Sequence, residues 1–136
     1  MSGPVGTTPL YDKLRLQPGQ RALVINAPES FYTALGNSLD GITVLSEPEG
    51  ELDFAILFAS DSAELTAAAP EIIAHLVEDG LLWVAYPKRS SGVETDLSRD
   101  LFWEILRSHG YRAVTQVYID PVWTAMRFRH VDFIGS

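Results

Sequence analysis

The chain has 136 residues, of which 46% are hydrophobic and 21% charged, so its length and composition suit one globular domain and exclude a disordered or fibrous protein. It contains no cysteine, which excludes disulfides, thiolate metal sites and a cysteine nucleophile. The longest apolar runs are strand-sized, and residues 1–9 lack the basic start and apolar core of a signal peptide. We therefore expect a soluble, cytoplasmic protein without a membrane segment.

The formal net charge of −8 is distributed unevenly along the chain. No Lys or Arg lies between Arg21 and Lys88, an interval that holds eleven carboxylates, whereas seven basic and six acidic residues follow residue 87. Because neutralising phosphates requires a basic face, this distribution argues against nucleic acid binding. The partners that it leaves open are a small anionic ligand, a protein partner and a second copy of the chain.

In chain order, residues 1–9 are expected to form a flexible tail, and residues 10–136 a single α/β domain. A short helix is predicted over residues 10–16, followed by a Pro-Gly turn at 17–20. The first strand is the apolar run 22–25, since such runs are typical of strands covered on both faces. A short helix from Pro28 to Leu35 separates it from a second strand at 42–45.

The apolar run 54–58 predicts a third strand, and the spacing of Asp61 and Glu64 is that of a capping box at the start of the next helix. We expect Pro70 to break this helix, with a further helical turn continuing through Leu76 and Val77 to Gly80.

A fourth strand is predicted at 81–86, before a polar loop and a helix that Thr95 or Asp96 caps and Gly110 ends. Two further strands, at 113–119 and 123–128, are close enough to form an antiparallel hairpin. Alternating strands and helices followed by a hairpin predict a three-layer Rossmann-like α/β sandwich, with a mostly parallel sheet and a C-terminal antiparallel hairpin.

The layout of residues 17–129 resembles the class I S-adenosylmethionine-dependent methyltransferases, in the helix and strand at 70–86 and in the last antiparallel hairpin. Short motifs also resemble a family of small bacterial proteins that share a domain of unknown function, with a YPK…SG..TDL.RD signature. These motifs are Pro18-Gly19-Gln20-Arg21, Asn26-Ala27-Pro28, Leu82-Trp83, Tyr86-Pro87-Lys88, Ser91-Gly92, Thr95-Asp96-Leu97, Arg99-Asp100, and Trp123 with Arg127-Phe128-Arg129. The second resemblance implies no particular activity.

The turn after the first strand reads VINAPES and has no glycine between Arg21 and Gly36. Nucleotide-binding turns use glycine so that the backbone can approach the cofactor, and Glu29 would partly neutralise the helix end that attracts an anion. We therefore predict no cofactor, and no binding of S-adenosylmethionine or a dinucleotide with a dissociation constant below about 10 µM, roughly −7 kcal/mol.

The loop after the fourth strand combines cations, hydroxyls and a glycine at the carboxyl ends of the strands, where ligands bind in open α/β sheets. The candidate anion site consists of Lys88, Ser90, Ser91, Gly92, Thr95 and Arg99. Because Glu94, Asp96 and Asp100 lie among them, purely structural capping roles are an open alternative.

Two tryptophans, Trp103 and Trp123, are candidates for a partner surface, with partial burial at the core boundary as the alternative. Arg127 and Arg129 share one strand face, and we interpret them as edge-strand charges that limit aggregation. No metal site is predicted, because His75, His109 and His130 lack ligand spacing and the carboxylates of residues 47–53 belong to a Pro/Gly turn.

Two functions of different classes remain. The favoured one is a non-catalytic module that binds a small anionic metabolite or a protein partner, because no nucleophile–base pair or cofactor fingerprint is visible and no catalytic residue is assigned. The alternative is a divergent transferase-type enzyme that uses the crevice around residues 86–99, with Tyr86, Lys88 and Asp96 as its polar groups.

Overall fold

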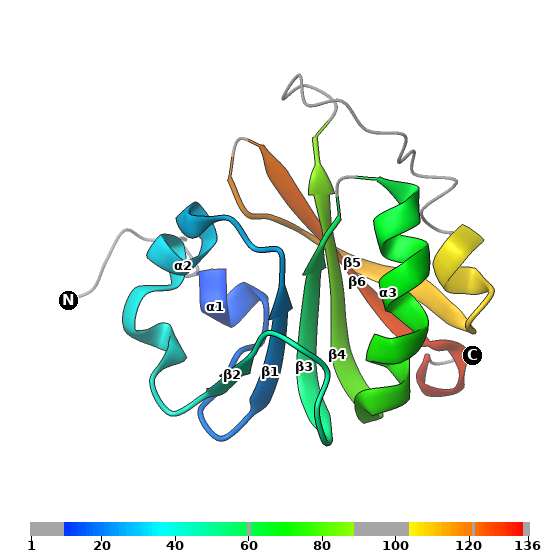
Figure 1. Cartoon of the computed structure of the whole chain (residues 1–136), viewed down its shortest axis with the longest axis horizontal. Coiled ribbons are helices and arrows are strands. Elements are labelled where there is room, and N and C mark those ends of the chain that lie inside the picture. The colour runs from blue at the N-terminus through cyan, green and yellow to red at the C-terminus, as the bar shows by residue number, and fades with distance from the viewer. Residues whose placement is uncertain (1–9, 60, 89–103, 121, 135–136) are drawn as a thin grey trace.

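The computed structural model describes residues 10–59, 61–88, 104–120 and 122–134. Its centre is a six-stranded sheet in the order β2-β1-β3-β4-β6-β5 (Figure 1). The strands are β1 (Arg21–Ile25), β2 (Thr43–Leu45), β3 (Leu52–Phe58), β4 (Leu76–Pro87), β5 (Tyr111–Tyr118) and β6 (Trp123–His130). The four strands β1 to β4 pair in parallel, and β6 runs antiparallel to both β4 and β5. The predicted α/β sheet with its C-terminal antiparallel hairpin is therefore confirmed.

Helices cover both faces of the sheet, as the unbroken apolar runs of β1 and β3 require. The helices with both ends among the described residues are α1 (Leu10–Lys13), α2 (Glu29–Leu35) and α3 (Ser62–His75), with 3₁₀ turns η1 (Gly36–Leu39) and η3 (Val131–Phe133). Residues 104–107 are also helical, within the helix that the sequence predicts before Gly110. Figure 1 shows α3 on one side of the sheet and α1 with α2 on the other. None of the described helices combines the length and the hydrophobicity needed to span a bilayer.

Each face of the sheet has its own core. Leu65, Ala69 and Ile72 of α3 pack with Leu57 and other strand residues on one face. On the opposite face, one cluster joins residues of the segment after α1, of α2 and of the sheet, among them Leu14, Leu16, Phe31, Leu35, Phe58 and Trp83. The Trp83 side chain is fully buried, and its Nε1 donates a hydrogen bond to the Leu14 carbonyl at 3.1 Å. This bond fastens the end of the short α1 segment to the middle of the sheet.

The expected break at Pro70 is wrong, because α3 continues through Pro70 as one helix to His75. The Asp61 carboxylate accepts a hydrogen bond from the Glu64 backbone N–H at 2.9 Å, so the predicted cap does start this helix. Pro70 itself is exposed, and the burial of its neighbours Ala69 and Ile72 against the sheet offsets the backbone bond that proline removes.

The expected helical turn from Leu76 to Gly80 is also wrong. These residues begin β4. Leu76 pairs with Leu52 of β3, a bulge follows, and regular pairing with β3 resumes at Leu81. Asp79 in the bulge has a positive φ of 56°. A bulge inserts extra residues without a periodic pattern, so the sequence could not reveal it.

Candidate functional site

The first wall of the candidate site is the turn between β1 and α2. Asn26 directly follows β1 and adopts a left-handed backbone conformation, with φ of 59°. Asparagine tolerates this conformation better than other residues with a side chain, although glycine is the usual occupant. Pro28 caps α2 without a side-chain hydrogen bond. The turn therefore has the tight backbone shape of a glycine turn but not its open surface.

The second wall is the start of α3, which follows β3. The Asn26 side chain donates a hydrogen bond from Nδ2 to Oε2 of Glu64 at 3.3 Å, linking the two walls. Asp61 caps α3 with its own carboxylate. Carboxylates and an amide thus occupy the carboxyl ends of β1 and β3, where a cofactor would approach the backbone in a nucleotide-binding sheet.

The third wall is the end of β4 together with the β5–β6 connection. The Lys88 backbone N–H donates to the Val122 carbonyl at 2.6 Å, and its ammonium lies 4.5 Å from the centre of the Tyr118 ring. Asp120 accepts hydrogen bonds from the backbone N–H groups of Val122 and Trp123, both at 2.8 Å. The end of β4 therefore carries a cation held beside an exposed aromatic ring.

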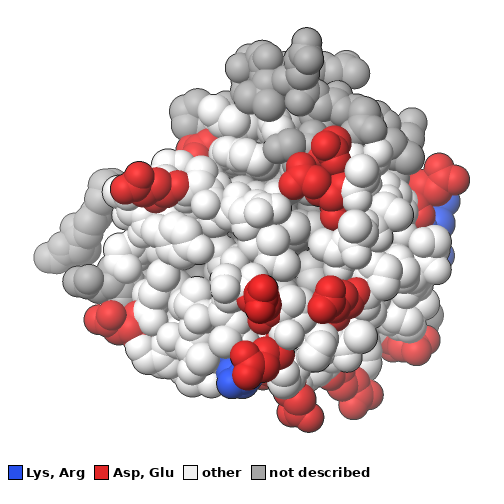
Figure 2. Space-filling view, viewed as in Figure 1, with Lys and Arg blue, Asp and Glu red and all other residues white. Residues whose placement is uncertain are grey.

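The electrostatic character of this end of the sheet is mixed. Ser30 of α2 donates a hydrogen bond to Asp120 at 3.4 Å, so α2 is joined to the hairpin connection. The described residues of the three walls include one cation, Lys88, and four carboxylates: Glu29, Asp61, Glu64 and Asp120. On the face shown in Figure 2, Asp and Glu side chains far outnumber Lys and Arg. Carboxylates therefore lie on the β1 and β3 side of this end of the sheet, and the Lys88 ammonium lies with Asp120 on the β4 side.

The predicted anion site is only partly within the described residues. Lys88 lies at the end of β4, as predicted, and is half-buried. Ser90, Ser91, Gly92, Thr95, Arg99, Trp103 and the alternative's Asp96 lie outside the described residues. Trp123 is half-buried, and its ring meets Phe58 edge-on with 5.2 Å between centroids. The partner-surface and anion-site assignments stay predictions.

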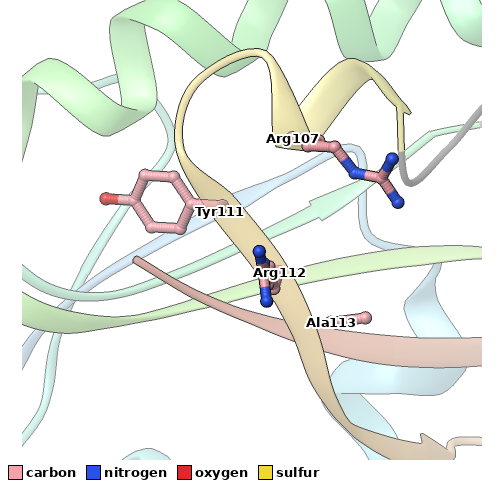
Figure 3. Close-up of a pocket in the computed structure, with 4 residues that line it drawn as sticks. All are labelled: Arg107, Tyr111, Arg112 and Ala113. Carbon is pink, nitrogen blue, oxygen red and sulfur yellow. The ribbon is translucent and has the colours of Figure 1, made fainter. Parts of the chain in front are cut away.

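Among the described residues, a pocket of about 500 Å³ is lined by Arg107, Tyr111, Arg112 and Ala113 (Figure 3). The Tyr111 ring points away from the Arg107 guanidinium in this view, so these groups do not converge on one point. Burial raises the pKa of the Tyr111 hydroxyl, and the Asp79 carboxylate raises it further. The side chains in Figure 3 therefore do not form one built polar site.

The carboxylate-rich loop of residues 47–53 is held by an arginine rather than arranged around a cation. Arg21 donates side-chain hydrogen bonds to the backbone carbonyls of Glu49 and Glu51, at 2.7 and 2.9 Å. His75 places Nδ1 2.8 Å from the Gly50 carbonyl. Within the described ranges, no three His, Asp or Glu side chains are grouped in a way that could hold a metal ion.

The interpretation of Arg127 and Arg129 as edge-strand charges is wrong, because β6 lies between β4 and β5 inside the sheet. Arg127 is only 7% exposed, and Arg129 forms a two-bond ion pair with Asp79 at 2.7 and 2.8 Å. Strand spacing along the chain does not reveal which strand of a hairpin is outermost, so the sequence could not identify Arg127 as a buried cation.

Comparison with solved structures places this fold among methyltransferases. The N-methyltransferase NodS from Bradyrhizobium japonicum WM9 matches with a TM-score of 0.57 and 14% identity, over 88% of this chain and 93% of that chain. Magnesium protoporphyrin IX methyltransferase from Synechocystis PCC 6803, with bound SAH, matches with a TM-score of 0.58 and 10% identity, over 83% of this chain and 74% of that chain. A putative type 11 methyltransferase from Sulfolobus solfataricus has a TM-score of 0.54 and 12% identity, covering 93% of both chains.

At these identities the comparisons show the fold alone: a methyltransferase-like Rossmann sheet with its antiparallel C-terminal pair. No protein-family model matches the chain, and no curated protein does. The resemblance to the family with a domain of unknown function therefore stays a prediction.

Proposed function

We propose that this chain is a divergent transferase-type enzyme on a methyltransferase-like fold, with its ligand in the crevice at the carboxyl ends of β1, β3 and β4. The observation that carries the proposal is the left-handed conformation of Asn26 in the turn after β1, with φ of 59°. This is the backbone shape that glycine gives to a nucleotide-binding turn. The methyltransferase-like fold around the turn supports the same assignment.

The side chains of the turn do not fit S-adenosylmethionine in the usual pose. Asn26 reaches across to Glu64, and Pro28 stands where the turn enters α2. Both groups occupy space that glycines would leave open for a cofactor. We therefore derive no chemical step through that cofactor, and we expect it to bind the wild-type chain with a dissociation constant weaker than about 10 µM.

A second candidate function, binding of a small anionic metabolite or protein partner without catalysis, is favoured by the Asn26–Glu64 hydrogen bond. If this bond always closes the turn after β1, a ligand can bind only on the β4 side of the crevice, beside Lys88. The two candidates therefore differ in whether opening the turn at Asn26 creates a site for the methyl donor.

Calorimetry with S-adenosylmethionine and its demethylated product tests the choice between the two candidates. Asn26→Gly removes the side chain and keeps the left-handed backbone, so the transferase proposal predicts at least a fivefold tighter dissociation constant than in the wild type. Asp79→Gly is the matched control, because Asp79 has a similar φ of 56° and lies in the bulge near the start of β4, away from the crevice. Absence of saturable binding to both wild type and Asn26→Gly at about 1 mM ligand, roughly −4 kcal/mol, would overturn the transferase proposal.

A further inference from the structure

Arg127 is a buried cation whose Nε has no hydrogen-bond acceptor. Arg127 lies in the middle of β6, opposite Trp83 of β4 and Thr115 of β5. Its side chain is 7% exposed, and its Nε has neither a hydrogen-bond partner nor appreciable access to water. Arginine stays charged in proteins, and a buried charge without a partner is strongly unfavourable. Among the described residues, Asp79 is the carboxylate that acts on Arg127, and Arg129 already binds both of its oxygens.

A second arginine, Arg15, lies near the same tryptophan. The hydrogen bond from Trp83 to the Leu14 carbonyl brings the end of α1 over Trp83, and Arg15 is the next residue along the chain. Trp83 is also the cross-strand partner of Arg127, so the backbones of Arg15 and Arg127 lie near the same tryptophan. Burial lowers the pKa of Arg127, the charges of Arg15 and Arg129 lower it further, and the Asp79 carboxylate acts in the opposite direction.

Among the described residues, one carboxylate near this pair is shared by two arginines. Arg129 lies two residues along the same strand face, and Arg112 is its partner across β5. Asp79 is the nearby carboxylate, and Arg129 already binds both of its oxygens. Asp79 also attracts Arg127, so Arg127 and Arg129 share this one carboxylate, and Arg15 adds a further positive charge in a chain whose net charge is −8.

We propose that Arg15 and Arg127 bind the phosphate group of a small-molecule ligand on the α1 face of the sheet. A phosphate carries nearly two negative charges and several acceptor oxygens, which match two guanidinium groups better than a single carboxylate does. Thr115 lies opposite Arg127 on β5, so its hydroxyl can be a further donor beside the phosphate. The limited exposure of Arg127 suits the end of a small molecule rather than a broad macromolecular surface.

This site is separate from the crevice of the proposed function. Trp83, the cross-strand partner of Arg127, lies four residues before Pro87, the end of β4, which corresponds to about 13 Å along a strand. The Arg15–Arg127 site and the Lys88 crevice can therefore be tested independently with single substitutions.

The experiment measures the melting temperature of the full chain with inorganic phosphate at constant ionic strength, with acetate as the carboxylate probe. A ligand that binds only the folded state raises the melting temperature in proportion to its occupancy. We expect phosphate to raise it for the wild type and for Lys88→Ala. Arg127→Met should abolish the shift. Arg15→Gln, a substitution at an exposed side chain, should weaken the apparent phosphate affinity at least threefold. Lys13→Gln, which removes the same charge from α1, is the matched control.

Arg127→Met should also be at least as stable as the wild type without phosphate, because methionine fills a similar space without a buried charge. Equal phosphate shifts in the wild type, Arg127→Met and Arg15→Gln would overturn the proposal. So would a larger shift with acetate than with phosphate. Loss of the shift in Lys88→Ala alone would place the anion in the crevice instead, and would refute this site without deciding between the two proposed functions.

Discussion

At the scale of single residues, Asp79 shows how a strained position is held in place. Its φ of 56° places it in the left-handed region, and both of its carboxylate oxygens accept hydrogen bonds from Arg129. The hydrogen bond from Arg129 lowers the pKa of Asp79 below its ordinary value of 3.8, although partial burial acts in the opposite direction. The ion pair therefore fixes the β4 bulge to β6.

Asp79→Asn should lower the free energy of unfolding at pH 7, because asparagine keeps the left-handed backbone but loses the charge on which the ion pair depends. A carboxylate with a depressed folded pKa contributes stability above its unfolded pKa, and that contribution is lost as the pH falls through the folded pKa. Urea unfolding at pH 7 and near pH 2 should therefore show a difference between variant and wild type that disappears in acid. A difference that is independent of pH would contradict this account.

At the scale of elements, apolar runs predicted the strands because both faces of this sheet are covered. The boundary between α3 and β4 was not predictable, since Leu76 and Val77 continue the helical spacing of Ile72 and Ile73 but begin β4, where Leu76 pairs with Leu52 of β3. Lys88 could be placed from the sequence because a strand end determines its position. The burial of Arg127 depends on strand order, and hydrophobic pattern alone does not determine strand order.

The continuous α3 leads to a prediction about its proline. Pro70→Ala should raise the free energy of unfolding by about 1–3 kcal/mol, because alanine restores the backbone hydrogen bond to residue 66 and relieves the clash that proline makes inside a helix. Pro70 is exposed, so the substitution removes little packing. Urea denaturation measures the change, and Thr66→Ala, on the same helix and also exposed, should gain only about 0.5 kcal/mol from propensity. Equal effects of the two substitutions would show that α3 bears no strain at Pro70.

At the scale of the whole molecule, the two faces of the sheet are covered unequally. The α3 face carries a 14-residue helix, whereas α1 has four residues and α2 has seven. Helices this short are not stable alone, so the second layer depends on its contacts with the sheet. Leu14, Leu16 and the Trp83 hydrogen bond supply those contacts for α1. The same attachment holds Arg15 near Arg127, so the integrity of this layer and the proposed phosphate site depend on one tryptophan.

Trp83→Phe should therefore loosen one layer more than the rest of the molecule. The substitution removes buried volume and leaves the Leu14 carbonyl without its donor, which together should lower the free energy of unfolding by about 2–4 kcal/mol. Trypsin cleavage after Lys13 or Arg15 under native conditions should become faster, since local release of α1 exposes these bonds. Phe128→Leu, a fully buried change on the α3 face, is the control: it should lower global stability without selectively accelerating cleavage at α1. If both variants are cleaved there at the same rate after correction for global stability, the Trp83–Leu14 bond does not anchor α1 to the sheet.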